Sequence, residues 1–135
     1  MTDRDFYRHW TTDTVRFSDQ DGTGHVNNVA VAAYVETGRL AFMREVVRLD
    51  RDQGESGILA KLTIDYLSES YWPGKVDIGS RLVRIGGKSF TVGSGLFRDG
   101  QCIATSESVL VYLKDRKSAP IAGALRERLE KLLAE

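Results

Sequence analysis

The chain has 135 residues, of which 41% are hydrophobic and 28% are charged, a composition typical of a globular protein with one core. Nineteen Lys and Arg residues balance nineteen Asp and Glu residues, so charge does not indicate binding to nucleic acid or to a membrane surface. No stretch reaches the roughly 18 apolar residues of a membrane-spanning helix, and the polar N-terminus does not resemble a signal peptide. We therefore expect a single domain over residues 1–135, located in the cytoplasm, where the one cysteine, Cys102, stays reduced.

Two hydrophobic periods divide the first part of the chain. Residues 12–17 alternate, with Val15 and Phe17 on one side, which predicts a short strand. Residues 28–49 instead repeat apolar side chains at steps of three and four, which predicts one long helix. Residues 29–35 carry no charge on any face, so the first half of this helix should be buried. The apolar positions of the helix are Val31, Val35, Gly38, Phe42, Val46 and Leu49.

Four further strands are predicted after a polar loop over residues 50–56. Their patterns cover residues 58–66, 76–85, 90–96 and 103–113. Gly86-Gly87 and Asp99-Gly100 suit two-residue hairpin turns, so the last three strands should form an antiparallel meander. Gly93 and Gly95, inside the middle strand of the meander, predict that the sheet curves sharply.

The tail after Pro120 carries apolar residues at helical spacing, which predicts a C-terminal amphipathic helix. The predicted order is therefore a strand, a long helix, four antiparallel strands and a last helix, which defines an α+β fold. A single sheet that wraps around one helix leaves its other surfaces exposed. We therefore expect a second copy of the chain to cover part of the molecule.

Residues 17–28 form a polar segment directly before the long helix. A turn that leads into a helix brings its side chains close to the free N–H groups of the first helical turn. Carboxylates and N–H donors in this arrangement can bind and attack a polarised carbonyl group. The candidate side chains of the segment are Asp19, Asp21, His25, Asn27 and Asn28.

Two unrelated motifs share part of this segment. Residues 19–23 resemble the phosphotransfer loop of haloacid-dehalogenase-type hydrolases, but the buried parallel strand and the βαβ pattern of that class are missing. The same residues also resemble an EF-hand loop, but Ala30 occupies the position of the bidentate glutamate. His9 and His25 are the only histidines, and there is no cysteine cluster. We therefore expect no metal site.

A third resemblance covers most of the chain. Residues 15–28 contain the string Asp-x-Asp-x-x-Gly-His-Val-Asn-Asn, and with residues 34–39 they resemble the start of hotdog-fold thioesterases of the 4-hydroxybenzoyl-CoA thioesterase type. The resemblance continues at residues 64–67 and 84–91 and through the last strand to Leu113, roughly 100 residues in all. The fold that it implies, a curved antiparallel sheet around a central helix, agrees with the order of elements predicted above.

The resemblance implies roles for four residues of the polar segment. Asp21 takes the position of the catalytic carboxylate, which acts as a nucleophile or as a general base on water. The backbone N–H of Asn28 takes the position that polarises the thioester oxygen. His25 orients water or Asp21 in this scheme, whereas Asp19 braces the turn before the helix.

The resemblance also implies four substrate-binding residues. Lys88 and Ser89 match a pair that contacts the nucleotide end of coenzyme A. Glu36 matches a position that lines the acyl or aryl pocket, although a simple ion pair with Arg39 explains it equally well. Gly57 matches the turn that closes the pocket.

This sequence departs from the family pattern at two places. Gly86 and Gly87 stand where some relatives have arginines, which leaves the carrier open between coenzyme A and an acyl-carrier protein; Arg84 or Lys61 could compensate. Ile58-Leu59 replaces a proline after Gly57, so the floor of the pocket should differ from that of relatives.

We therefore expect an acyl-CoA thioesterase that hydrolyses a thioester to a free acid and CoA. It needs no cofactor, since coenzyme A enters as part of the substrate. The family places its active site between two subunits, which implies a homodimer or a tetramer of dimers. The alternative is a non-catalytic acyl-CoA or acyl-ligand binding module, although a binder gains nothing from the carboxylate of Asp21.

Overall fold

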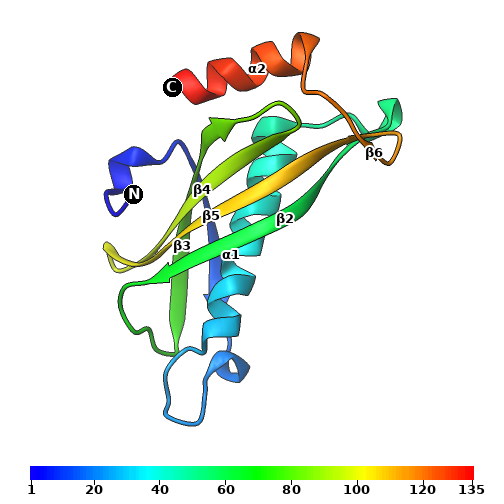
Figure 1. Cartoon of the computed structure of the whole chain (residues 1–135). Coiled ribbons are helices and arrows are strands. Elements are labelled where there is room, and N and C mark those ends of the chain that lie inside the picture. Colours follow the sequence, from blue (N-terminus) through cyan, green and yellow to red (C-terminus); the bar gives the residue numbers. More distant parts are fainter.

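The computed structural model describes all 135 residues as one antiparallel sheet curled around a long helix (Figure 1). The strand order in the six-stranded sheet is β1-β3-β4-β5-β2, with β6 paired to β5. The expected meander is confirmed as β3-β4-β5, and β2 pairs with β5 at the edge of the sheet. The strands are β1 (His9–Val15), β2 (Glu55–Tyr66), β3 (Gly74–Ile85), β4 (Ser89–Arg98), β5 (Gln101–Lys114) and β6 (Lys117–Ser118).

The helices lie along the concave side of the sheet and at its upper end (Figure 1). Short 3-10 turns occur at η1 (Arg4–Phe6), η2 (Phe17–Asp19) and η4 (Arg51–Gln53). The two α-helices are α1 (Asn28–Phe42) and α2 (Gly123–Ala134), and α1 continues into a π-helical turn, η3 (Met43–Val47). No helix is long and apolar enough to cross a membrane.

The long helix differs from the prediction at its C-terminal end. The apolar pattern predicted a helix to Leu49, whereas the α-helical hydrogen bonds stop at Phe42 and η3 ends at Arg48, which has a φ of 52°. The wider π turn keeps Val47 fully buried beside Phe42 in the core. The apolar spacing therefore located the buried face correctly but could not distinguish the two kinds of helical turn.

The first strand also differs from its predicted bounds. It begins at His9 and ends at Val15, and Phe17 lies in η2 with 70% of its surface exposed. The chain leaves the sheet at Arg16 because the backbone N–H of Arg16 donates to the Asp19 carboxylate instead of a neighbouring strand. The alternation of Val15 and Phe17 was therefore a coincidence of composition.

Two hydrophobic clusters fill the space between the sheet and the helices. One cluster lies under the first half of α1 and includes Tyr34 and Val35. The other lies under the end of α1 and is closed by Leu125 and Leu129 of α2. Gly38 lets α1 approach the sheet closely, since a Cβ atom there would lie 2.3 Å from Cγ2 of Ile78.

The outer face of the sheet is partly covered by the N-terminal segment. Tyr7 lies over Gly95, and any side chain larger than hydrogen at Gly95 would overlap the tyrosine ring. The sequence predicted that this glycine serves curvature, and the structure adds close contact with Tyr7 as a second reason for it. Burial raises the pKa of the Tyr7 hydroxyl, which donates to the Met1 carbonyl at 2.5 Å.

Candidate active site

The polar segment forms a tight turn that is fixed by its own backbone. The N–H of Asp21 donates to the carbonyl of His25 at 2.8 Å, and the N–H of Asn27 donates to the carbonyl of Asp19 at 2.8 Å. The Asp19 carboxylate accepts hydrogen bonds from the Arg16 N–H at 2.8 Å and from the Tyr34 hydroxyl at 2.5 Å. Asp19 therefore ties the turn to the first half of α1.

Asp21 has a different environment from Asp19. Its Oδ1 accepts hydrogen bonds from the Thr23 N–H at 2.8 Å, the Thr23 hydroxyl at 2.7 Å and the His25 N–H at 3.1 Å. These bonds, led by that of the Thr23 hydroxyl, lower the pKa of the exposed Asp21 carboxyl. The carboxylate is therefore ionised at neutral pH, and its second oxygen, Oδ2, has no protein donor.

The N-terminus of α1 provides free hydrogen-bond donors beside this carboxylate. The side chain of Asn27 caps the helix, because its oxygen accepts from the N–H of Ala30 at 2.6 Å. The N–H groups of Asn28 and Val29 have no protein acceptor. Asn28 at the helix start and Asp21 line the same cavity, so the partial positive charge of the helix N-terminus lies beside the space that Asp21 borders.

His25 lies in a chain of polar contacts that reaches Asp21. The Thr23 hydroxyl donates its one hydrogen to Asp21, so its oxygen accepts from Nδ1 of His25, 2.8 Å away. Nε2 of His25 lies 3.1 Å from Oε2 of Glu69, and the imidazole ring contacts the ring of Tyr71. His25 therefore orients the Thr23 hydroxyl that in turn holds Asp21.

Sequence reasoning missed Glu69, which lies in the connection between β2 and β3. Residues 67–73 connect β2 to β3, and Arg98 of β4 fixes this connection by donating to the Ser70 hydroxyl at 2.6 Å and to the carbonyls of Tyr71 and Pro73. No local pattern predicts a contact between residues so far apart in the chain. Thr23, in contrast, was predictable, since a threonine two residues after an aspartate often bonds to its carboxylate.

A cavity of about 320 Å³ brings the three predicted catalytic residues together. Asp21, His25 and Asn28 line one side of it, and Tyr66 lines another side and donates a hydrogen bond to the Asn28 carbonyl at 3.0 Å. The remaining wall combines apolar side chains, such as Val31 and Ile103, with the polar residues Ser68, Glu69 and Ser70. A polarised ligand with an apolar end fits this combination of walls.

The four predicted substrate-binding residues lie outside this cavity. Glu36 is 63% exposed on α1, with its carboxylate 3.6 Å from the guanidinium of Arg39. Lys88 lies in the turn between β3 and β4, and Ser89 is the first residue of β4. Gly57 lines a larger cavity at the opposite end of α1.

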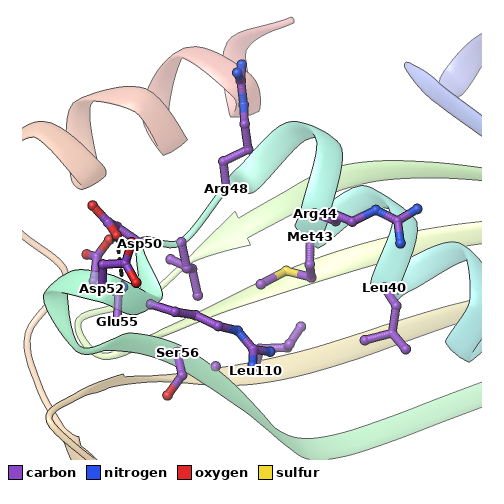
Figure 2. A pocket seen from close by; sticks show the side chains of 12 residues that line it. Leu40, Met43, Arg44, Arg48, Asp50, Asp52, Glu55, Ser56 and Leu110 are labelled. Carbon is purple, nitrogen blue, oxygen red and sulfur yellow. Dashed lines mark hydrogen bonds between the residues drawn. The ribbon is translucent and has the colours of Figure 1, made fainter.

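This larger cavity has a volume of about 570 Å³ and lies between the end of α1 and the start of β2. Figure 2 shows the side chains of Leu40, Met43 and Leu110 around its apolar part. Asp50, Asp52 and Glu55 form an acidic rim (Figure 2). A helix of this length separates its two ends by about 22 Å, so one subunit does not join the two cavities.

Two further expectations concern Cys102 and metals. Cys102 is a partly buried strand residue, and burial raises the pKa of its thiol, which disfavours the reactive thiolate. No three His, Cys, Asp or Glu side chains are grouped closely enough to hold a metal ion.

Comparison with known proteins identifies the class to which this fold and site correspond. The thioesterase-like superfamily model matches residues 15–129, and the chain therefore belongs to this superfamily. Its curled sheet and central helix form the hotdog fold, as the sequence predicted. A search of curated proteins gave no significant match.

Solved structures agree with this assignment. A protein from Pseudomonas aeruginosa is 30% identical, with a TM-score of 0.80 over 96% of this chain and 94% of that chain. A thioesterase from Thermus thermophilus, complexed with coenzyme A and Zn, is 29% identical, with a TM-score of 0.80 over 93% and 95%. A predicted thioesterase from Bacillus stearothermophilus is 26% identical, with a TM-score of 0.79 over 92% and 95%.

Proposed function

We propose that this protein hydrolyses acyl-CoA thioesters, with Asp21 as the catalytic carboxylate. The observation that carries the proposal is that one cavity is lined by both Asp21, whose Oδ2 has no protein donor, and Asn28, whose N–H has no protein acceptor. Similarity to a thioesterase that was crystallised with coenzyme A supports CoA as the carrier. The products are a free carboxylic acid and the CoA thiol.

The chemistry requires two groups in this cavity. The thioester oxygen accepts a hydrogen bond from the Asn28 N–H, so charge that develops on the oxygen meets the positive end of the helix. Asp21 then attacks the carbonyl carbon through Oδ2, or it takes a proton from a water molecule that attacks. In the first route the thiolate leaves, an anhydride between the acyl group and Asp21 forms, and water hydrolyses it to the acid and the free carboxylate. In the second route water adds to the carbonyl carbon, the thiolate leaves and takes up the proton that Asp21 holds, and the acid forms in a single hydrolytic step.

His25 and Thr23 serve as positioning residues in this scheme. The Thr23 hydroxyl binds Oδ1 of Asp21 and His25 binds this hydroxyl, which leaves Oδ2 free to act on the substrate. Hydrogen bonds at Oδ1 also lower the pKa of the carboxyl, so the reactive ionised form persists in mild acid. Glu69 completes the chain by fixing the outer nitrogen of His25.

We further propose that two copies of the chain complete the substrate site. The outer edge of β2 has no strand neighbour, and Ile58 and Tyr66 on this strand are 55% and 48% exposed. Val29 and Leu40, on one side of α1, are 80% and 56% exposed. Such an unpaired edge and apolar stripe favour burial against a second copy.

Antiparallel pairing of two β2 strands would bring the two cavities together. In this pairing Glu55, at the start of β2 in one copy, lies opposite Tyr66, at the end of β2 in the second copy. The larger cavity, lined by Gly57 of the first copy, then lies beside the cavity that Tyr66 and Asp21 of the second copy line. The acyl group would then enter the larger cavity while the thioester stays at Asp21. We expect a homodimer as the minimal active unit, with a tetramer of dimers as the larger form.

Three expectations stay proposals. Lys88 is exposed at the turn and Ser89 is half-buried at the start of β4, where both can meet the nucleotide end of CoA, and Glu36 is open to a ligand at the proposed interface. We propose that the reaction uses no cofactor beyond the CoA of the substrate. The single cysteine supports a reducing location such as the cytoplasm.

Release of free thiol from a panel of short, long and aromatic acyl-CoAs tests the proposed function. The same acyl groups on an acyl-carrier protein distinguish the two carriers. We expect thiol release from at least one acyl-CoA at a rate well above the uncatalysed rate. Tight binding of these ligands without thiol release would instead identify a non-catalytic acyl-ligand binding module.

A further inference from the structure

A third cavity, of about 450 Å³, lies at the opposite edge of the sheet from β2. It exists because β1 begins at His9, which pairs with Ser80, whereas β3 continues to Ile85. The C-terminal part of α2 and the η3 turn close over the open edge of β3. This cavity shares no lining residue with the cavity around Asp21.

The inner wall of this third cavity is apolar. Phe42 and Leu82 are 2% and 1% exposed and belong to the core, and Val46 and Leu132 pack against the same core. A ligand that reached this wall would therefore bury an apolar body rather than a polar one.

The mouth of the third cavity is strongly cationic. Its lining includes five basic side chains, namely Arg8, Arg48, Arg81, Arg128 and Lys131. The opposing carboxylates belong to Glu45 and Glu135, and Arg81 already donates hydrogen bonds to the main-chain oxygens of Glu135 and Phe6. Glu45 is already bound to His9, with Oε2 2.5 Å from Nε2, so its charge is engaged at one side of the cavity.

Several of these cations have free hydrogen-bonding capacity. The side chains of Arg48 and Lys131 make no hydrogen bond or ion pair within the protein, and Figure 2 shows Arg48 extending away from the larger cavity towards α2. Arg128 donates through Nη2 to the Val47 carbonyl at 2.8 Å, whereas its buried Nε has no partner. The buried Nε cannot be reached by a ligand, so the accessible cations, Arg48 and Lys131 among them, are the ones available to an anionic group.

We propose that this cavity binds a small organic anion that has an apolar body and one carboxylate. The apolar wall would hold the hydrocarbon part, and the guanidinium groups would hold the carboxylate. The proposal rests on this cavity alone and does not depend on chemistry at Asp21.

Hexanoate is a suitable probe because it combines a hydrocarbon chain with one carboxylate. Two control compounds each lack one feature: 1-hexanol has no charge, and acetate has no hydrocarbon chain. Amide NMR shifts of Val46, Leu82 and Leu132 would report binding. We expect saturable shifts with hexanoate at about 1 mM, as is usual for so small a ligand. Hexanol and acetate should bind at least tenfold more weakly.

A charge-matched pair of variants tests the site itself. Arg8→Gln combined with Lys131→Gln removes two mouth cations, and we expect at least tenfold weaker hexanoate binding. Lys75→Gln combined with Lys117→Gln removes two exposed cations elsewhere and should bind as the wild type does. Circular dichroism would check the folding of both.

Three results would overturn the proposal. These are the absence of saturable shifts at the third cavity, equal binding by the two double variants, and hexanol binding as tight as hexanoate. Hexanoate shifts confined to the Asp21 and Gly57 cavities also count as absence. The Asp21→Asn variant should bind hexanoate as the wild type does. Binding at the third cavity can therefore be judged even if the thioesterase proposal fails.

Discussion

The two oxygens of the Asp21 carboxylate have different partners, and the proposed mechanism uses the free one. Oδ1 accepts three hydrogen bonds from the turn, whereas Oδ2 has no protein donor, and Asp21 lines the cavity. Asp19 has the same side chain two residues earlier, but Arg16 and Tyr34 occupy it. The hydrogen bond to Asp19 and burial together raise the pKa of the Tyr34 hydroxyl, which keeps it a donor.

Removal of the Thr23 hydroxyl tests how the turn tunes Asp21. Thr23→Val loses the bond that contributes most to the lowered pKa of Asp21, so this pKa should rise. Because the reaction needs the ionised carboxylate, the rate falls as pH falls through this pKa. The acid limb of the kcat/KM profile should therefore move to higher pH in Thr23→Val and stay in place in Thr23→Ser. An unchanged limb in Thr23→Val would show that this bond does not tune the catalytic group.

Among the elements, the connection over residues 67–73 positions the site from outside the polar segment. Arg98 makes three hydrogen bonds to this connection, which carries Glu69 towards His25. Arg98→Ala should lower kcat by about tenfold or more, because small displacements of catalytic groups are costly. Hydrogen exchange of residues 68–73 should rise in parallel. Arg4→Ala, which removes an exposed pair with Asp77 far from this connection, provides the control and should leave kcat and exchange unchanged.

The contact between α1 and the sheet is equally specific. Gly38→Ala would place a methyl group 2.3 Å from the Ile78 side chain, so one of the two elements must shift. We expect a loss of about 1–3 kcal/mol in the free energy of unfolding, measured with urea. Gly87→Ala meets no atom within 4 Å and should change stability by less than about 0.5 kcal/mol. Equal stabilities for both variants would contradict this close contact.

Local patterns predicted most elements, and long-range contacts explain what they missed. The period-two and period-four patterns located β2 to β5, α1 and α2, because each pattern is dictated by one buried face. They could not predict that β2 pairs with β5 or that Glu69 meets His25, since neither contact leaves a mark in neighbouring residues. The grouping of Asp21, His25 and Asn28 was predictable because one turn carries all three.

At the scale of the whole molecule, the exposed β2 edge and α1 stripe predict self-association. Leu40→Glu combined with Ile58→Glu should yield a monomer by sedimentation analysis, because two charges would enter the proposed interface. Folding should persist, since both side chains are more than half exposed in the single chain. Leu133→Glu on α2 is the control and should keep the wild-type size. A wild-type protein that sediments as a monomer at micromolar concentration would contradict the proposal.

The most direct test of the account compares kcat for the wild type, Asp21→Asn and Asp19→Asn on the acyl-CoA that is hydrolysed fastest. Loss of the catalytic carboxylate should reduce kcat at least 100-fold in Asp21→Asn, with KM within about threefold of the wild-type value. Asp19→Asn should lose thermal stability but retain most of its kcat at a temperature where it is folded. Equal kcat values for Asp21→Asn and the wild type, or a larger loss in folded Asp19→Asn than in Asp21→Asn, would contradict the central role of Asp21.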